Sequence, residues 1–133
     1  MQIILVGINH KTAPVEIREQ LTCDSQLVAE ALEKLKSAYP SSEFVLLSTC
    51  NRVECYAAAE KDTGPSPEDL AKWLAGFRVV DFRDIEEFVY IKSNEEAVRH
   101  LFTVAPGLDS MVIGENQIPS QVKESYKIAC KFE

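Results

Sequence analysis

The chain has 133 residues, of which 46% are hydrophobic and 26% charged, and its net charge at pH 7 is −7. This balance predicts one globular domain with a buried core, and it excludes nucleic-acid binding driven by a global positive field. No apolar run reaches the roughly 18–20 residues of a membrane helix, and the amino terminus has no pattern of a cleavable signal. We therefore expect a cytoplasmic protein that contacts no membrane.

Four cysteines are scattered along the chain, with no CxxC pair among them: Cys23, Cys50, Cys55 and Cys130. This spacing argues against a zinc ribbon and against a thioredoxin-type redox motif. Cys50 and Cys55 are close in sequence, but no second pair of cysteines or histidines completes a tetrahedral set. We predict reduced thiols and no metal site.

The first half of the chain is predicted to run strand, helix, strand, strand. Residues 2–9 form a nearly continuous apolar run, which is typical of a central strand. A helical turn around 15–19 leads to a longer helix over 24–38, where apolar residues recur at helical spacing. Residues 43–49 and 53–59 are predicted strands with a short connection between them, which favours an antiparallel hairpin.

The second half is predicted to add a helix, a short strand and further helices. A serine cap, a proline and two acids open a helix over 66–77, and a short strand follows at 88–91. Ser93 and Glu96 form a capping box that opens the next helix, and a last helix is predicted over 119–132. The order of elements predicts an α+β protein of the ferredoxin-like split βαβ type, with an antiparallel sheet, helices on one face and additional C-terminal helices.

The most informative segment is 48–54, with the sequence Ser-Thr-Cys-Asn-Arg-Val-Glu. Cys50 ends a predicted buried strand and therefore emerges at an edge of the sheet. Arg52 supplies a positive charge that either lowers the pKa of the thiol or holds an anionic substrate. A buried cysteine beside a turn is the alternative interpretation, and these seven residues alone do not decide between the two.

A second candidate region is the loop over 107–118, where two glycines bracket a mixture of apolar and polar residues. This composition suits a backbone wrapped round a pocket, although a purely structural loop has the same character. His100 lies on the predicted helix before the loop and is a candidate general acid or base beside Cys50. A histidine on a helix is more often structural, and His10 has weaker support than His100.

Three motifs together resemble the catalytic domain of the glutamyl-tRNA reductases. Residues 7–19 are similar to the amino-terminal signature of that family, 48–54 to its cysteine motif, and 107–118 to its second substrate loop. The motifs occur in matching order over almost the whole chain. The resemblance implies that 1–133 is a catalytic domain in which 107–133 holds the substrate loop and the start of a linking helix.

Members of that family reduce glutamyl-tRNA with NADPH to glutamate-1-semialdehyde, the first step of tetrapyrrole synthesis from glutamate. The resemblance implies that Cys50 attacks the aminoacyl ester, expels tRNA and leaves a thioester for hydride reduction. Elementary chemistry agrees, because a thiolate suits ester attack and a thioester accepts hydride better than a carboxylate. The implied partners are glutamyl-tRNA, a second copy of the full-length enzyme, and the aminomutase that takes up the product.

The resemblance also assigns roles to individual residues. His100 matches a histidine needed for full activity, through proton transfer, and Arg52 would grip the side-chain carboxylate of the substrate. Thr49 and Asn51 flank the nucleophile and would line the same pocket. The second loop would supply the remaining substrate-binding residues, with Glu115 on the ammonium group: Ser110, Glu115, Asn116, Gln117 and Gln121.

The resemblance implies that no cofactor-binding residue lies in this chain. The family's reductases continue into an NADPH-binding domain and a dimerisation helix, whereas this sequence has no GxGxxG after a strand. We expect a fragment limited to forming or hydrolysing the thioester. Glu54 is as well explained by a pair with a nearby base as by a direct role.

Two other functions remain open from the sequence. The first is a stand-alone regulatory or binding domain of the same fold without reductase activity. The second is a generic cysteine hydrolase, which needs only Cys50 and His100 and leaves the loop over 107–118 unexplained. The fold itself does not separate these functions, because one architecture carries many activities.

Overall fold

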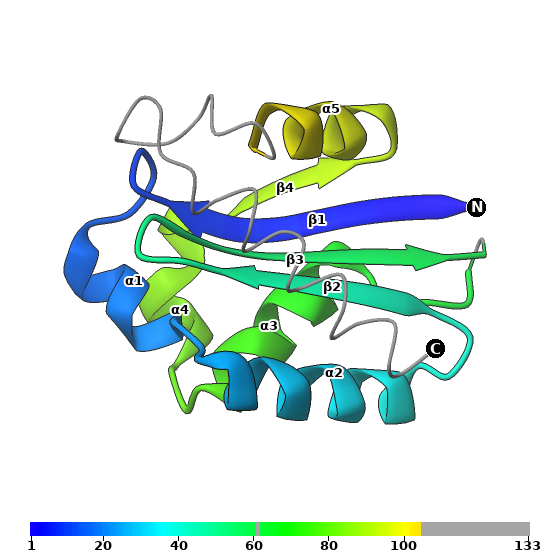
Figure 1. Cartoon of the computed structure of the whole chain (residues 1–133), viewed down its shortest axis with the longest axis horizontal. Coiled ribbons are helices and arrows are strands. Elements are labelled where there is room, and N and C mark those ends of the chain that lie inside the picture. The colour runs from blue at the N-terminus through cyan, green and yellow to red at the C-terminus, as the bar shows by residue number, and fades with distance from the viewer. Residues whose placement is uncertain (61, 105–133) are drawn as a thin grey trace.

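The computed structural model describes residues 1–60 and 62–104 (Figure 1). Over these residues, four strands form one antiparallel sheet in the order β2-β3-β1-β4: β1 (Gln2–Asn9), β2 (Glu43–Ser48), β3 (Arg52–Ala59) and β4 (Tyr90–Ser93). The helices are α1 (Val15–Leu21), α2 (Ser25–Ala38), α3 (Pro67–Phe77), α4 (Phe82–Ile85), a 3-10 turn η1 (Glu86–Phe88) and α5 (Glu95–Val104). The predicted α+β class and the antiparallel sheet are confirmed.

The two long helices begin where capping residues satisfy free backbone N–H groups. Asp24 accepts a hydrogen bond from the backbone N–H of Leu27 at 2.8 Å and so starts α2. Ser66 accepts from the N–H of Asp69 at 3.0 Å, and Pro67 occupies the first turn of α3. Both helix starts agree with the sequence prediction.

The two faces of the sheet are covered by different helices (Figure 1). Alternate residues of β1 point to opposite faces, so Ile4 and Val6 join the main core under α2 and α3, while Leu5 packs with Ala97 of α5. We expected the helices on one face. That placement holds for α2 and α3, whereas α5 covers the opposite face because its apolar stripe meets the other set of strand residues.

The fourth strand lies two residues later than predicted. The apolar residues at 88–91 suggested a strand there, but Asp81 caps the short helix α4 and the 3-10 turn carries the chain on to Phe88. The strand β4 therefore begins at Tyr90 and pairs with β1, with Tyr90 opposite Gly7.

The predicted capping box at Ser93 is wrong. Ser93 ends β4, and Asn94 precedes α5 with a positive φ of 51°. Asn94 binds Ile3 twice: its side-chain oxygen accepts from the Ile3 N–H at 3.0 Å, and its own N–H donates to the Ile3 carbonyl at 2.7 Å. The connection from β4 to α5 is thus held in place by the backbone of Ile3 in β1.

The loop over 107–118 and the helix predicted over 119–132 lie outside the described residues. None of the helices in the described part of the chain has both the length and the apolar character needed to cross a membrane.

Candidate active site

Cys50 lies on the tight turn that joins β2 to β3, and its side chain is exposed. Thr49 closes the turn: its N–H donates to the Arg52 carbonyl at 2.8 Å, and its hydroxyl accepts from the N–H groups of Asn51 and Arg52 at 3.0 and 3.1 Å. Thr49 and Asn51 are themselves buried. The turn therefore holds the thiol outward on a fixed backbone, as the sequence predicted for the end of a strand.

Arg18 of α1 fixes the turn from a second direction. Its Nη1 donates to the Cys50 carbonyl oxygen at 2.9 Å, and its side chain is 9% exposed. This contact joins residues 32 positions apart in the chain. The backbone of Cys50 is consequently anchored both within the hairpin and to the neighbouring helix.

The exposure of Cys50 separates it from the other described thiols. Cys23 and Cys55 are buried. Burial raises the pKa of Cys23, although the charge of Arg78 opposes the shift, and burial raises the pKa of Cys55 to about 12. These two thiols stay protonated near neutral pH and serve as core residues, which leaves Cys50 as the nucleophile candidate among the described cysteines.

Arg52 and Glu54 form a buried ionic pair beside the turn. Both side chains are 0% exposed, and Nη1 of Arg52 lies 3.7 Å from Oε2 of Glu54. The two residues alternate along β3 with Val53, so they lie on the face of the sheet that α5 covers. Buried charges are costly unless they are paired, and this pair therefore defines a polar site under α5.

The Glu54 carboxylate accepts hydrogen bonds from three side chains. Oε1 accepts from the Tyr56 hydroxyl at 3.2 Å, and Oε2 accepts from the Tyr90 hydroxyl and from Nε2 of His100, the latter at 2.5 Å. Burial and the nearby Glu54 carboxylate raise the pKa of both tyrosines, which keeps the hydroxyls protonated as donors. Strands β3 and β4 and helix α5 meet at this one carboxylate.

Gly7 provides the space for this arrangement. A Cβ atom at Gly7 would lie 2.7 Å from the Val53 carbonyl oxygen and 2.9 Å from Cγ of Glu54. Because the first neighbour is backbone, a side chain at this position would push β1 away from β3 or displace Glu54. The glycine at this point of β1 is therefore required by the buried carboxylate.

His100 is bonded to Glu54 rather than to the thiol. Within the described residues, no hydrogen bond joins Cys50 Sγ to His100 or to any other side chain. Since Nε2 donates its proton to the carboxylate, Nδ1 is the acceptor nitrogen of the neutral ring. The Glu54 bond thus fixes both the orientation and the tautomer of the imidazole, whose side chain is 12% exposed.

Five of the predicted substrate-binding residues lie outside the described residues: Ser110, Glu115, Asn116, Gln117 and Gln121. The structure brings the other predicted residues to one end of the hairpin, with Thr49, Asn51 and Cys50 on the turn and Arg52 at the start of β3. His100 joins them through Glu54.

The sequence did not predict three residues of the site: Tyr56 and Tyr90, which donate to Glu54, and Arg18, which donates to the Cys50 carbonyl. The alternation of Arg52, Glu54 and Tyr56 along one strand is a signal that places all three on the same face. No such signal exists for Tyr90 or Arg18, because strand pairing and helix packing bring them in from distant parts of the chain.

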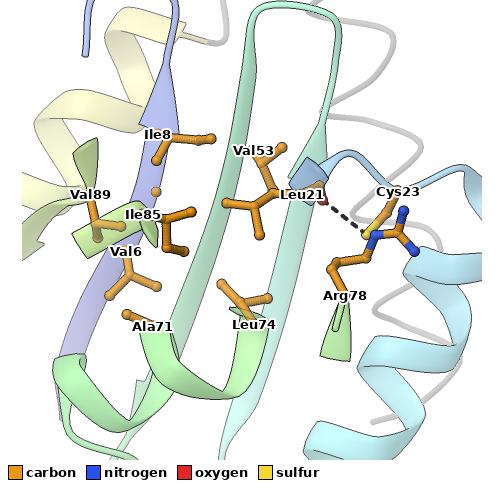
Figure 2. Close-up of a pocket in the computed structure, with 11 residues that line it drawn as sticks. Val6, Ile8, Leu21, Cys23, Val53, Ala71, Leu74, Arg78, Ile85 and Val89 are labelled. Atoms are coloured by element: carbon orange, nitrogen blue, oxygen red, sulfur yellow. Dashed lines mark hydrogen bonds between the residues drawn. The ribbon is translucent and has the colours of Figure 1, made fainter. Parts of the chain in front are cut away.

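A cavity on the opposite face of the sheet is too small for a substrate. It measures about 20 Å³, which is room for about one water molecule, and its lining is almost entirely apolar. Figure 2 shows the apolar side chains converging there, with Cys23 and Arg78 together at one side. This cavity is a small gap in the main core. Among the described residues, no group of three histidine, cysteine or acidic side chains is arranged to hold a metal ion.

A family model described as the N-terminal domain of glutamyl-tRNAGlu reductase matches residues 6–133. The chain belongs to this family. The match includes the segment that carries Cys50, Arg52 and Glu54 and also the part of the chain beyond the described residues. The resemblance identified from the motifs is therefore confirmed.

Individual relatives agree with this assignment. Glutamyl-tRNA reductases of Marinobacter nauticus and Shouchella clausii are each 47% identical over 97% of this chain, which corresponds to 29% and 28% of their own lengths. The solved structure of the glutamyl-tRNA reductase from Methanopyrus kandleri matches 98% of this chain and 28% of its own, with a TM-score of 0.73 and 38% identity. The chain thus spans less than a third of the relatives it matches.

Proposed function

We propose that this domain catalyses the first half of the glutamyl-tRNA reductase reaction, transfer of the glutamyl group from tRNA to Cys50. The observation that supports the proposal most directly is the exposed thiol on a doubly anchored turn, next to the buried pair of Arg52 and Glu54. The strand order β2-β3-β1-β4 also supports the split βαβ fold inferred from the sequence.

In this mechanism the Cys50 thiolate attacks the carbonyl carbon of the aminoacyl ester. The C–S bond forms, the bond from the carbonyl carbon to the ribose oxygen breaks, and the tRNA leaves with a proton on its terminal hydroxyl. Arg52 binds the side-chain carboxylate of the glutamyl group, and Thr49 and Asn51 line the pocket. Ser110, Glu115, Asn116, Gln117 and Gln121 complete the proposed substrate contacts.

His100 supplies the proton to the leaving oxygen in the proposed mechanism. Its Nε2 is committed to Glu54, so proton exchange falls to Nδ1, which has no hydrogen-bond partner among the described residues. The carboxylate of Glu54 stabilises the imidazolium that forms when Nδ1 takes the proton of the thiol. Glu54 is thus a positioning residue, and His100 and Cys50 are the proposed catalytic residues.

The full-length relatives imply NADPH as the reductant of the thioester, but the described residues do not fit that cofactor. A pyrophosphate needs a glycine-rich turn between a strand and a helix. The glycine near the first strand-to-helix connection, Gly7, lies inside β1 and is packed against Glu54. We therefore assign to these residues no part in the reduction. A homodimer, docking to the aminomutase and a cytoplasmic location belong to the same proposal for the whole enzyme.

The test is a single-turnover assay with glutamyl-tRNA charged with labelled glutamate. The wild-type chain should release tRNA and carry the label on the peptide that contains Cys50. Cys50→Ser should release tRNA at least about 100-fold more slowly, because a serine hydroxyl is a far weaker nucleophile. Cys23→Ala is the matched control and should keep the wild-type rate.

Equal rates for Cys50→Ser and wild type would show that the nucleophile is wrongly assigned. Turnover of simple esters with no preference for glutamyl-tRNA would instead support a generic cysteine hydrolase. Binding of glutamyl-tRNA without release would support a binding domain.

A further inference from the structure

A groove beside Cys50 opens on the side of the turn away from Arg52. Its polar lining comes from α1, the link to α2 and the end of α3: Arg18, Glu19, Thr22, Asp24, Cys50 and Arg78. Arg52, Glu54 and His100 lie instead under α5 on the other face of the sheet. The thiol therefore stands between two polar regions, and we call the first of these the Cys50 groove.

Arg18 presents to the Cys50 groove a positive charge that has no ion-pair partner among the described residues. Its side chain is nine-tenths buried, and its single side-chain hydrogen bond to a described residue is the one from Nη1 to the Cys50 carbonyl. Nε is buried without a hydrogen-bond partner, and no carboxylate of the described residues lies within 4.0 Å of the guanidinium. Buried arginines are normally paired with an anion, so this one points to an anionic ligand.

Arg78 adds a second positive charge to the same groove. It follows the last turn of α3 and lies next to Cys23, as Figure 2 shows. Its Nε is also buried without a hydrogen-bond partner, and it forms no ion pair with a described residue. Two guanidinium groups, one from α1 and one from the residue that follows α3, thus line the groove, and neither forms an ion pair with a described residue.

The acidic residues of the groove, Glu19 and Asp24, form no ion pair with these arginines. The side chain of Asp24 caps α2 by accepting from the N–H of Leu27, and Glu19 is exposed. Thr22 is likewise engaged, because its hydroxyl donates to the Arg18 carbonyl at 2.8 Å. The free anion-binding capacity of the groove therefore resides in the two guanidinium groups.

We propose that the Cys50 groove binds the phosphodiester of the 3′-terminal nucleotide of the tRNA, the leaving group of the acyl transfer. This inference rests on the proposed function. If Cys50 attacks the ester on the terminal ribose, the 5′-phosphate of that nucleotide is separated from the attacked carbonyl carbon only by the ribose and its two ester oxygens, and so lies close to the thiol. Guanidinium groups bind phosphate through paired N–H donors. Arg52 then selects the acyl group on one side of Cys50, and Arg18 and Arg78 hold the leaving group on the other.

The groove also reconciles the acidic chain with a polyanionic substrate. A net charge of −7 gives no long-range attraction for tRNA. Two arginines without ion-pair partners among the described residues supply free N–H donors beside the nucleophile, at the one nucleotide whose position the chemistry fixes.

The first test compares two small glutamyl esters, 3′-O-glutamyl-adenosine 5′-monophosphate and 3′-O-glutamyl-adenosine, which differ only in the phosphate. For Arg18→Gln and for Arg78→Gln, KM for the phosphate-bearing ester should rise about tenfold. For the ester without phosphate, KM should stay unchanged in Arg78→Gln. In Arg18→Gln, which also loses the hydrogen bond to the Cys50 carbonyl, it should rise by less than for the phosphate-bearing ester. Arg83→Gln, at an exposed arginine of α4, is the matched control. Equal effects of each variant on the two esters, or no effect on either, would overturn the proposal.

The second test does not require turnover. The rate of Cys50 alkylation by iodoacetamide is followed by mass spectrometry of the Cys50 peptide, with the dinucleotide cytidylyl-3′,5′-adenosine or with adenosine present. The dinucleotide should slow alkylation of the wild type, adenosine should not, and both arginine variants should lose the protection. Equal behaviour of dinucleotide and adenosine overturns the proposal.

The two tests separate failure of the groove from failure of the proposed function. Protection of Cys50 that depends on the arginines, without turnover of either ester, would support the phosphate site and contradict the proposed acyl transfer. Turnover of both esters with no dependence on the phosphate would support the acyl transfer and contradict the phosphate site. Arg18→Gln could act by distorting the Cys50 turn, because Arg18 donates a hydrogen bond to the Cys50 carbonyl. Arg78 makes no hydrogen bond to this turn, so an effect of Arg78→Gln reports on the groove itself.

Discussion

The face of the sheet under α2 and α3 and the face under α5 are both buried, but they bury different chemistry. Under α2 and α3 the strands contribute aliphatic residues such as Ile4, Val6 and Leu46. Under α5 the same strands contribute Arg52 and Glu54, which meet the hydroxyls of two tyrosines and the ring of His100. The first face buries the larger apolar cluster, and the second combines a smaller one, which contains Leu5 and Ala97, with polar interactions that are weak unless every partner is present.

The largest effect is expected at the centre of the polar face. Glu54→Gln removes the charge that faces buried Arg52, and the free energy of unfolding should fall by about 3–5 kcal/mol. The measurement is urea denaturation of the variant and the wild type. Glu95→Gln breaks an exposed pair with Arg99 on α5 and should cost less than about 1 kcal/mol.

If Glu54→Gln lowers the free energy of unfolding no more than Glu95→Gln does, the buried polar groups under α5 contribute no more to stability than a surface ion pair. The two faces of the sheet would then not differ in the way proposed.

A smaller effect is expected where the two faces meet at β1. Gly7→Ala places a methyl group against the Val53 carbonyl and Glu54, which should destabilise the fold by about 1–3 kcal/mol. Gly76→Ala is the matched control, because nothing lies within 4 Å of its added Cβ and it sits inside α3. That change should stabilise the helix by about 0.5–1 kcal/mol. Thermal unfolding of both variants would show shifts of opposite sign; shifts of the same sign would rule out close packing at Gly7.

On the apolar face, the buried thiol of Cys55 should make the free energy of unfolding depend on pH. Burial raises the pKa of Cys55 from 9.0 to about 12, so above pH 9 the unfolded chain loses this proton while the folded chain keeps it. Stability is therefore fully present below pH 9 and is lost as the pH rises toward 12, by at most about 1.4 kcal/mol per pH unit from this thiol. The midpoint of urea denaturation, followed from pH 7 to 11, tests this.

Cys55→Ala should reduce the slope of that loss between pH 9 and 10; the remaining slope comes from Cys23, whose pKa is also raised by burial, and from the unfolded tyrosines, which ionise near pH 10. The free energy of unfolding that Cys55→Ala loses at pH 7–8, below the ordinary pKa of a thiol, is subtracted from the values at higher pH. An unchanged slope would mean that another group controls the alkaline response.

Local patterns explain which predictions succeeded. Asp24 and Ser66 were recognisable as helix caps because the bond is made to a residue three positions away. The hairpin around Cys50 was recognisable because only a few polar residues separate two apolar runs. The start of β4 was misplaced by two residues, since Phe88, the last residue of the 3-10 turn, and Val89 after it are as apolar as the strand residues that follow.

The sequence by itself determined the family, the place of Cys50 at the end of a strand and the position of Arg52 two residues after it, because motifs and strand ends are local properties of the chain; that Cys50 is exposed came from the structure. Only the tertiary structure decided that His100 is bonded to Glu54, that Tyr90 completes the network, and that Arg18 and Arg78 flank the thiol from the other side. The physical reason is that strand pairing and helix packing join residues 46 positions apart, as in Glu54 and His100, or 91 positions apart, as in Ile3 and Asn94. No spacing along the chain encodes which partner each side chain will meet.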